Sequence, residues 1–160
     1  MSFLHKLFGK KSSEKEIAHQ AKPLNVNLGD VQDFILEGIV EKGTPQAIFI
    51  QKTGAKELTG IEETVITPDL ARQALKAKKH EHQAENLVRS GKYGEAVKEY
   101  KLAIEIAPYE DELLYMSMGA ILAELGKNRK ALRYLEIAHE INPLNERVAK
   151  NLATGRKTLV

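Results

Sequence analysis

The chain has 160 residues, 42% of them hydrophobic, and its 24 lysines and arginines nearly balance its 22 acidic residues, so the net charge is +2. It has no cysteine, which excludes thiol nucleophiles, cysteine-ligated zinc, iron–sulfur clusters and disulfides. Its apolar runs fall far short of the roughly 20 residues that span a bilayer, and its balanced charge argues against non-specific nucleic-acid binding. We therefore expect a cytoplasmic protein with one ordinary domain, or a small domain with an appendage.

The charge is spread unevenly and divides the chain into three segments. Residues 1–22 carry a net charge of +3, residues 23–67 a net charge of −4, and residues 68–160 a net charge of +3. The breaks coincide with changes in the hydrophobic pattern. The sequence therefore predicts three units of organisation.

The first unit is a basic amphipathic segment followed by a linker. Its apolar side chains are Phe3, Leu4, Leu7 and Phe8, and its basic ones are Lys6, Lys10 and Lys11. This pattern is typical of a short interfacial helix, and each lysine would contribute about 1 kcal/mol on an anionic membrane surface. A frayed terminus, or a helix that packs on the rest of the protein, explains the pattern equally well.

The second unit is predicted to contain a short helix and a β-hairpin. Residues 29–43 suit an amphipathic helix that Asp30 caps and Gly43 ends. Its apolar face would hold Val31, Phe34, Ile35 and Ile39. Residues 46–51 read as one strand and residues 57–66 as a returning strand. The open alternatives are an αββ cap on the third unit and a partly disordered linker.

A long helix is predicted to begin the third unit at Pro68. Thr67 is suited to cap it, proline fits the first turn, and Asp69 lies near the positive end of the helix dipole. No helix breaker follows until Gly91. The pattern therefore predicts a helix of about 22 residues.

The C-terminal half contains an internal repeat with a period of 35 residues. Residues 91–108 and 126–143 share the order glycine–lysine, alanine, large side chain, alanine and proline at the same spacings. The matched pairs are Gly91/Gly126, Ala96/Ala131, Tyr100/Leu135, Ala103/Ala138, Ile106/Ile141 and Pro108/Pro143. A repeat of this length indicates supersecondary units that stack on one another.

The composition of the repeat is that of a helical hairpin. Small residues let two antiparallel helices approach closely, and large residues fill the space beside them. The small ones are Ala84, Ala96, Ala103, Gly119, Ala131 and Ala138, and the large ones are Leu87, Tyr100, Leu122 and Leu135. Gly91 and Gly126 suit the end of the first helix, while Pro108 and Pro143 stop the second.

These spaced positions resemble the tetratricopeptide repeat. The resemblance covers about 77–145, with repeats at about 77–111 and 112–145 and a capping helix at about 146–157. It implies a mostly α fold, an α-solenoid of stacked antiparallel helical hairpins. A small N-terminal α+β or partly disordered segment would precede this solenoid.

Two features depart from the family pattern. His80 and Gln83 stand where large apolar residues are usual, so we expect the first helix to pack differently. One residue beyond the usual 34 falls in the loop 109–111, where an insertion costs little.

His80 and His82 are two residues apart and point to different sides of a helix, so no metal site is expected there.

In the tetratricopeptide family, the first helix of each repeat lines a concave groove that holds a peptide or a partner's helix. Carried over by position, the groove residues are Lys78, Glu81, Glu85, Val88, Leu113, Met116, Ala120, Ala123, Arg147 and Lys150. The four from residues 113–123 form an apolar strip that suits an amphipathic helix or extended apolar side chains. The alternative is that Leu113 and Met116 pack against the N-terminal segment.

The resemblance implies a non-catalytic adaptor that binds a protein or peptide and uses no cofactor, nucleic acid or small-molecule substrate. One subfamily clamps the C-terminal carboxylate of heat-shock chaperones at positions that hold Glu81 and Glu85 in this chain. These acids would repel a carboxylate, so such a clamp is not expected. Two repeats make a shorter groove than three, which points to a homodimer or to help from residues 1–67.

Two other functions stay open from the residues alone. A peripheral-membrane adaptor would use residues 2–11 to contact anionic lipid on the inner face of a membrane while the repeats recruit a partner. An enzyme would need its site in residues 23–67, which contain no histidine, serine or cysteine. We find no nucleophile motif and no metal-ligating set in the sequence.

Overall fold

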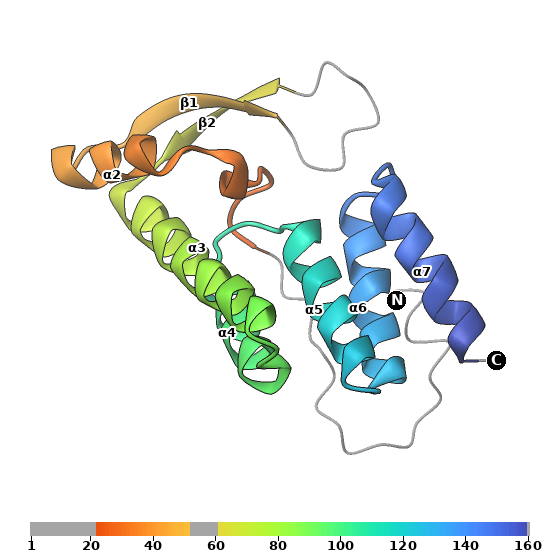
Figure 1. Ribbon diagram of the computed structural model, residues 1–160. Helices are drawn as coiled ribbons and strands as arrows, with labels where there is room; N and C mark the ends of the chain where they lie inside the picture. Colours follow the sequence, from red (N-terminus) through yellow and green to blue (C-terminus); the bar gives the residue numbers. More distant parts are fainter. Residues whose placement is uncertain (1–21, 52–60, 160) are drawn as a thin grey trace.

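The computed structural model describes residues 22–51 and 61–159 (Figure 1). Its elements are the 3-10 helix η1 (Leu28–Asp30), helix α2 (Asp33–Lys42), strands β1 (Gln46–Gln51) and β2 (Ile61–Ile66), and helices α3 (Pro68–Arg89), α4 (Tyr93–Ile106), α5 (Glu112–Glu124), α6 (Asn128–Ile141) and α7 (Glu146–Thr158). The expected mostly α fold with a small N-terminal α+β part is confirmed. The amphipathic segment 2–11 lies outside the described residues.

The C-terminal half is a stack of helical hairpins. α3 pairs with α4 and α5 pairs with α6, while α7 packs on α6 as a final helix. Figure 1 shows these helices following one another across the molecule from α3 to α7. The long first helix begins at Pro68 as predicted, and the Thr67 hydroxyl oxygen accepts a hydrogen bond from the Leu70 amide at 3.2 Å. The hairpins and the capping helix predicted from the repeat are therefore present.

The two hairpin turns have the same hydrogen-bond geometry. In the first turn the Lys92 amide donates to the Leu87 carbonyl oxygen at 2.9 Å, and in the second the Lys127 amide donates to the Leu122 carbonyl oxygen at 2.8 Å. The glycine before each lysine has a positive φ, 73° in the first turn and 71° in the second. This is the Schellman ending of a helix, and it explains the two repeated glycines.

Small residues let neighbouring helices approach closely. All the predicted small positions are buried: Ala84, Ala96, Ala103, Gly119, Ala131 and Ala138. The tightest is Gly119 on α5, where an added Cβ would lie 2.8 Å from Leu135 Cγ and 3.1 Å from the Ala131 carbonyl oxygen. The observed spacing of α5 and α6 therefore requires a glycine at this point.

The N-terminal part forms an αββ cap on the first hairpin. β1 and β2 pair antiparallel, with Gln46 opposite Ile66 and Gln51 opposite Ile61. Residues 57–60, which were expected to begin the second strand, lie outside the described residues. The cap shares one hydrophobic cluster with α3, which includes Leu36, Ile39, Ile50, Ile66, Ala71, Ala74 and Ala77. Of the two alternatives for this region, the structure shows the αββ cap.

α2 differs from its predicted form in start and in orientation. Asp30 does not cap it, because this residue belongs to η1 and α2 begins at Asp33. Phe34, expected on the buried face, is 67% exposed, whereas Leu36 is fully buried. The face that packs on α3 is set by Leu36, Ile39 and Val40. Their i, i+3, i+4 spacing leaves Phe34 on the solvent side.

Residues 22–28, termed the strap, cross from the cap to the loop between α4 and α5. The Leu24 amide donates to the Pro108 carbonyl oxygen at 3.0 Å, and Leu24 forms an isolated parallel bridge with Tyr109. The loop 109–111, where one extra residue was expected to cost little, is not an open loop, since Tyr109 and Asp111 are buried beneath the strap and η1.

We predict that Gly119→Ala lowers the free energy of unfolding by about 1–3 kcal/mol, because the added methyl group overpacks the α5–α6 contact. Urea denaturation followed by circular dichroism measures the change. Gly94→Ala on α4 is the matched control, since nothing lies within 4 Å of its added Cβ. The control should be neutral or stabilising by up to about 1 kcal/mol. Equal effects of the two substitutions would contradict the close approach at Gly119.

Candidate peptide-binding face

The outward sides of α3, α5 and α7 form the candidate site, which we term the first-helix face. In Figure 1, α5 lies between α3 and α7. The ten groove residues predicted from the repeat all lie on these three helices. Their exposure and partners differ from helix to helix, so each helix contributes a different chemistry.

α5 supplies small and apolar side chains at the middle of the face. Leu113 is 39% exposed, and Ala120 and Ala123 are also exposed. Met116 is only 4% exposed and packs in a hydrophobic cluster with side chains of α6 and α7, including Val148. Met116 therefore lies beneath the face and does not line it. The sequence pattern could not show this, because α7 covers a position that an isolated repeat leaves open.

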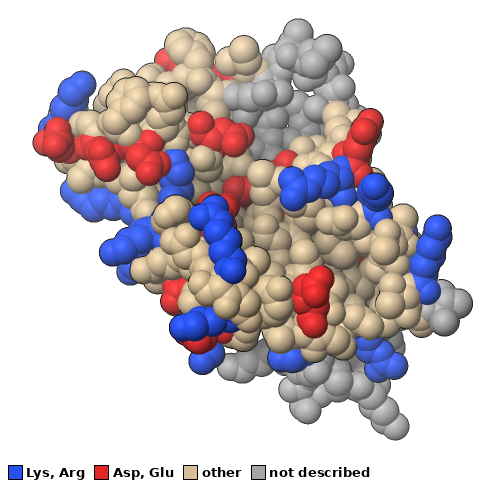
Figure 2. Space-filling model, viewed as in Figure 1, with Lys and Arg blue, Asp and Glu red and all other residues tan. Residues whose placement is uncertain are grey.

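α7 supplies positive charge at its N-terminal half. Arg147 and Lys150 are both exposed. The Asn145 side chain fixes the start of the helix by accepting hydrogen bonds from the amides of Arg147 and Val148, at 3.1 and 3.2 Å. Figure 2 shows lysine and arginine side chains over this part of the molecule, with largely uncharged surface between them and α3.

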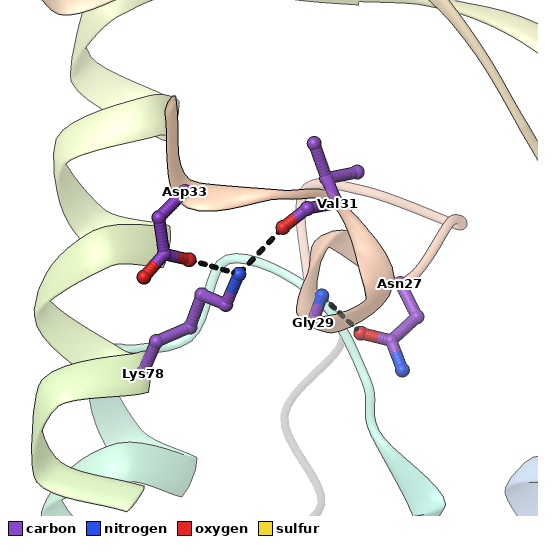
Figure 3. Close-up of polar contacts among 5 residues, drawn as sticks. All are labelled: Asn27, Gly29, Val31, Asp33 and Lys78. Atoms are coloured by element: carbon purple, nitrogen blue, oxygen red, sulfur yellow. Dashed lines mark hydrogen bonds and ion pairs between the residues drawn. The ribbon is translucent and has the colours of Figure 1, made fainter. Parts of the chain in front are cut away.

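α3 supplies Lys78, whose ammonium group binds other residues of the chain. Its Nζ donates to the Val31 carbonyl oxygen at 2.5 Å and forms an ion pair with Asp33 (Figure 3). These contacts fasten the residues between η1 and α2 to the side of α3. Lys78 therefore holds the cap in place, and its positive charge is already matched by Asp33.

Glu81, one turn further along α3, is half-buried and lacks a cation partner among the described residues. Burial raises the pKa of its carboxyl group to about 7, and the negative charges of Asp111 and Glu85 add to this effect. Lys78 acts in the opposite direction but does not cancel it. Of the two remaining predicted α3 residues, Glu85 is half-buried, and Val88 is half-buried against the α4–α5 cluster.

Asp111 brings a second acid to the same place from the start of α5. Its carboxylate accepts a hydrogen bond from the Leu113 amide at 2.8 Å, as an N-cap does. Burial raises its pKa to about 6 even though this bond and a hydrogen bond with the Asn27 side chain act to lower it. A Cβ on Gly29 would lie 2.9 Å from Asp111 Oδ2, so the glycine lets η1 lie close to this carboxylate without displacing it.

Tyr109 completes this region, which we term the acidic junction (Glu81, Tyr109 and Asp111). The tyrosine side chain is 2% exposed, and its hydroxyl group has no hydrogen-bond partner in the part of the chain that the structure describes. Burial raises its pKa, and the nearby carboxylates of Asp111 and Glu81 raise it further. Sequence reasoning missed Tyr109 and Asp111. The available signal was an acid directly before the leucine-rich start of a helix.

His80 explains one departure from the repeat pattern. Its Nδ1 lies 2.6 Å from Oε2 of Glu99, so a polar contact joins α3 to α4 where an apolar one is usual. Among residues 22–51 and 61–159, no group of three histidines or acids is placed to hold a metal ion. No helix in these ranges has the length and apolar character needed to cross a membrane.

We predict that Glu81→Gln raises stability at pH 8 and that its advantage over wild type shrinks as the pH falls to 5. The pKa of Glu81 is raised in the folded state, so between its ordinary value and about 7 the folded protein binds the extra proton. Wild-type stability is therefore recovered as pH falls through this window, and the glutamine variant has nothing to recover. Thermal unfolding at several pH values measures the difference.

Glu95→Gln on α4 is the control for this experiment. Glu95 is an exposed acid in the first turn of α4. Its replacement should give a difference from wild type that does not follow the trend of Glu81→Gln. A Glu81→Gln advantage that stays constant from pH 5 to 8 would show that burial does not perturb this carboxyl group.

The fold resembles that of a solved structure, although the sequence matches no known family. No family model matches the sequence, and no curated protein matches it. A solved structure, the second tetratricopeptide domain of Spaghetti (RPAP3) bound to the HSP90 peptide SRMEEVD, superposes with a TM-score of 0.52 at 17% identity. The match covers 55% of this chain and 81% of that chain. Together with the stacked hairpins, it shows that the C-terminal half has the fold of a tetratricopeptide repeat domain.

Proposed function

We propose that this chain is a non-catalytic interaction module that binds a peptide segment of a partner protein on the first-helix face. The observation that carries the proposal is the row of exposed small and apolar side chains on α5, namely Leu113, Ala120 and Ala123. The row lies on the central helix of the face, with charged side chains on the helices to either side. This is the composition of a peptide groove, in which apolar contact gives affinity and flanking charge gives register.

The structural neighbour supports a peptide as the ligand. The RPAP3 domain has the same fold and is bound to a peptide. In this chain the two alanines leave room for side chains of a ligand, while Leu113 offers apolar area beside them. An amphipathic helix or an extended segment with apolar side chains would fill this space.

The length of the face sets the expected strength of binding. Two hairpins and α7 present fewer helices than a groove of three full repeats. A small interface of this kind favours a transient complex over a permanent one. We therefore expect dissociation constants of about micromolar size, as for many adaptor contacts.

The test uses a displayed library of short random peptides selected on the immobilised full chain. Binding of the selected peptides is then measured by fluorescence anisotropy against wild type and against Ala120→Glu/Ala123→Glu. Both alanines are exposed, so the variant should fold normally. We expect it to lose at least about tenfold in affinity, since two charged side chains would occupy the apolar row.

Leu102→Glu on α4 is the matched control. Leu102 is an exposed apolar residue on a second helix of a hairpin, away from the first-helix face. Its change to glutamate alters exposed hydrophobicity without altering the face, and it should keep wild-type affinity. Peptides that bind the α5 variant and the wild type equally would move the binding site elsewhere on the molecule.

A further inference from the structure

We propose that the acidic junction receives a cationic side chain, lysine or arginine, of the bound peptide. This inference rests on the proposed function and adds the chemistry of the ligand. It assigns Glu81 and Asp111 as the negative partners and the Tyr109 hydroxyl group as a hydrogen-bond acceptor. The ligand's cation would bind at the α3 side of the face while its apolar side chains contact α5.

Three elements build the junction. Glu81 comes from the middle of α3, Tyr109 from the loop after α4, and Asp111 from the start of α5. The strap holds the loop from one side, since Leu24 pairs with Tyr109. η1 closes it from another side at Gly29, where an added Cβ would lie 2.9 Å from Asp111 Oδ2. The acids are therefore held together by packing despite their mutual repulsion.

The charges of the junction are not balanced from within the protein. Lys78 is the cation whose charge acts on Glu81, and it is engaged by Asp33 and the Val31 carbonyl oxygen. Asp30 adds a further negative charge close to both Glu81 and Asp111. Within the described ranges, neither Glu81 nor Asp111 has an ion-pair partner. An incoming cation would meet a site with net negative charge and low hydration, where such contacts are strong.

The Tyr109 hydroxyl group is a second observation, independent of the acidic charges, that favours a polar ligand at the junction. It is buried, the carboxylates of Asp111 and Glu81 lie close enough to act on it, and it has no hydrogen-bond partner in the described part of the chain. Buried polar groups are almost always paired, because leaving one unpaired costs about 1–3 kcal/mol. An ammonium or guanidinium group that enters beside Glu81 carries several N–H donors and would supply this partner.

An organic cation fits the junction better than a metal ion does. No set of three histidine or acidic side chains in the described residues has the arrangement of a metal site. Two carboxylates and one phenol can, however, satisfy the three N–H donors of a lysine side chain. The ligand thus differs in charge from the HSP90 peptide bound by the RPAP3 domain, which carries three acidic residues.

The test compares three pools of short random peptides that differ in one fixed residue: lysine, norleucine or glutamate. Retention on the immobilised full chain should be about tenfold higher for the lysine pool than for the glutamate pool. Glu81→Gln should reduce this preference toward unity while keeping the binding of the norleucine pool. Glu124→Gln removes an equal charge from the exposed end of α5 and should keep the full preference.

Two further readouts separate a ligand contact from a structural role. Tyr109→Phe removes a buried hydroxyl group without a partner, so it should keep or raise thermal stability yet lower retention of the lysine pool. Retention of that pool should also rise from pH 6 to 8 as Glu81 loses its proton in the field of Asp111, Glu85, Asp30 and Lys78. Retention of the norleucine pool should not change between pH 6 and 8, because norleucine carries no charge.

The outcomes distinguish this inference from the proposed function. If all three pools are retained equally and Ala120→Glu/Ala123→Glu abolishes their retention, the face binds peptides but the junction selects no cation. If that double variant retains every pool as wild type does, both proposals fail together. A lysine preference that persists in Glu81→Gln and in Tyr109→Phe places the cation elsewhere and overturns the inference.

Discussion

The alanine stripe of α3 is the contact on which the rest of the structure depends. Ala71, Ala74, Ala77 and Ala84 are almost completely inaccessible to solvent. The first three pack against the αββ cap and the last against the α4–α5 cluster. One helix can serve two partners because its side chains there are no larger than a methyl group, so backbones approach closely on both sides. A larger residue in this stripe would push the cap or the hairpin away and open the acidic junction between them.

The hairpins could be predicted from the sequence because local rules decide them. Glycine ends the first helix of each hairpin, proline follows the second, and alanines recur at the spacing of a helix interface. Thr67 and Pro68 mark the start of α3 by equally local chemistry. Each of these signals involves residues a few positions apart, so no knowledge of the rest of the fold is needed.

The cap and the site could be predicted only in part, since their details depend on contacts between distant residues. Phe34 was placed inside and Met116 was placed on the surface, and in both cases the neighbouring helix decides the outcome. Tyr109 and Asp111 were assigned to a permissive loop because the repeat pattern says nothing about a strap lying over it. Periodicity gives the face of a helix, whereas burial requires knowing what covers that face.

The acidic junction depends on the strap, because the strap covers the loop that carries Tyr109 and Asp111. The hairpins close through contacts between near neighbours in sequence, and such contacts form quickly. The bond from Leu24 to Pro108 closes a much longer loop, so we expect it to form after α3 and α4 are in place. In that order of folding, the acidic junction would be complete only after this last closure. By linkage, anything that binds the junction also opposes opening of the strap, so an occupied face would protect the N-terminal part of the fold from local unfolding.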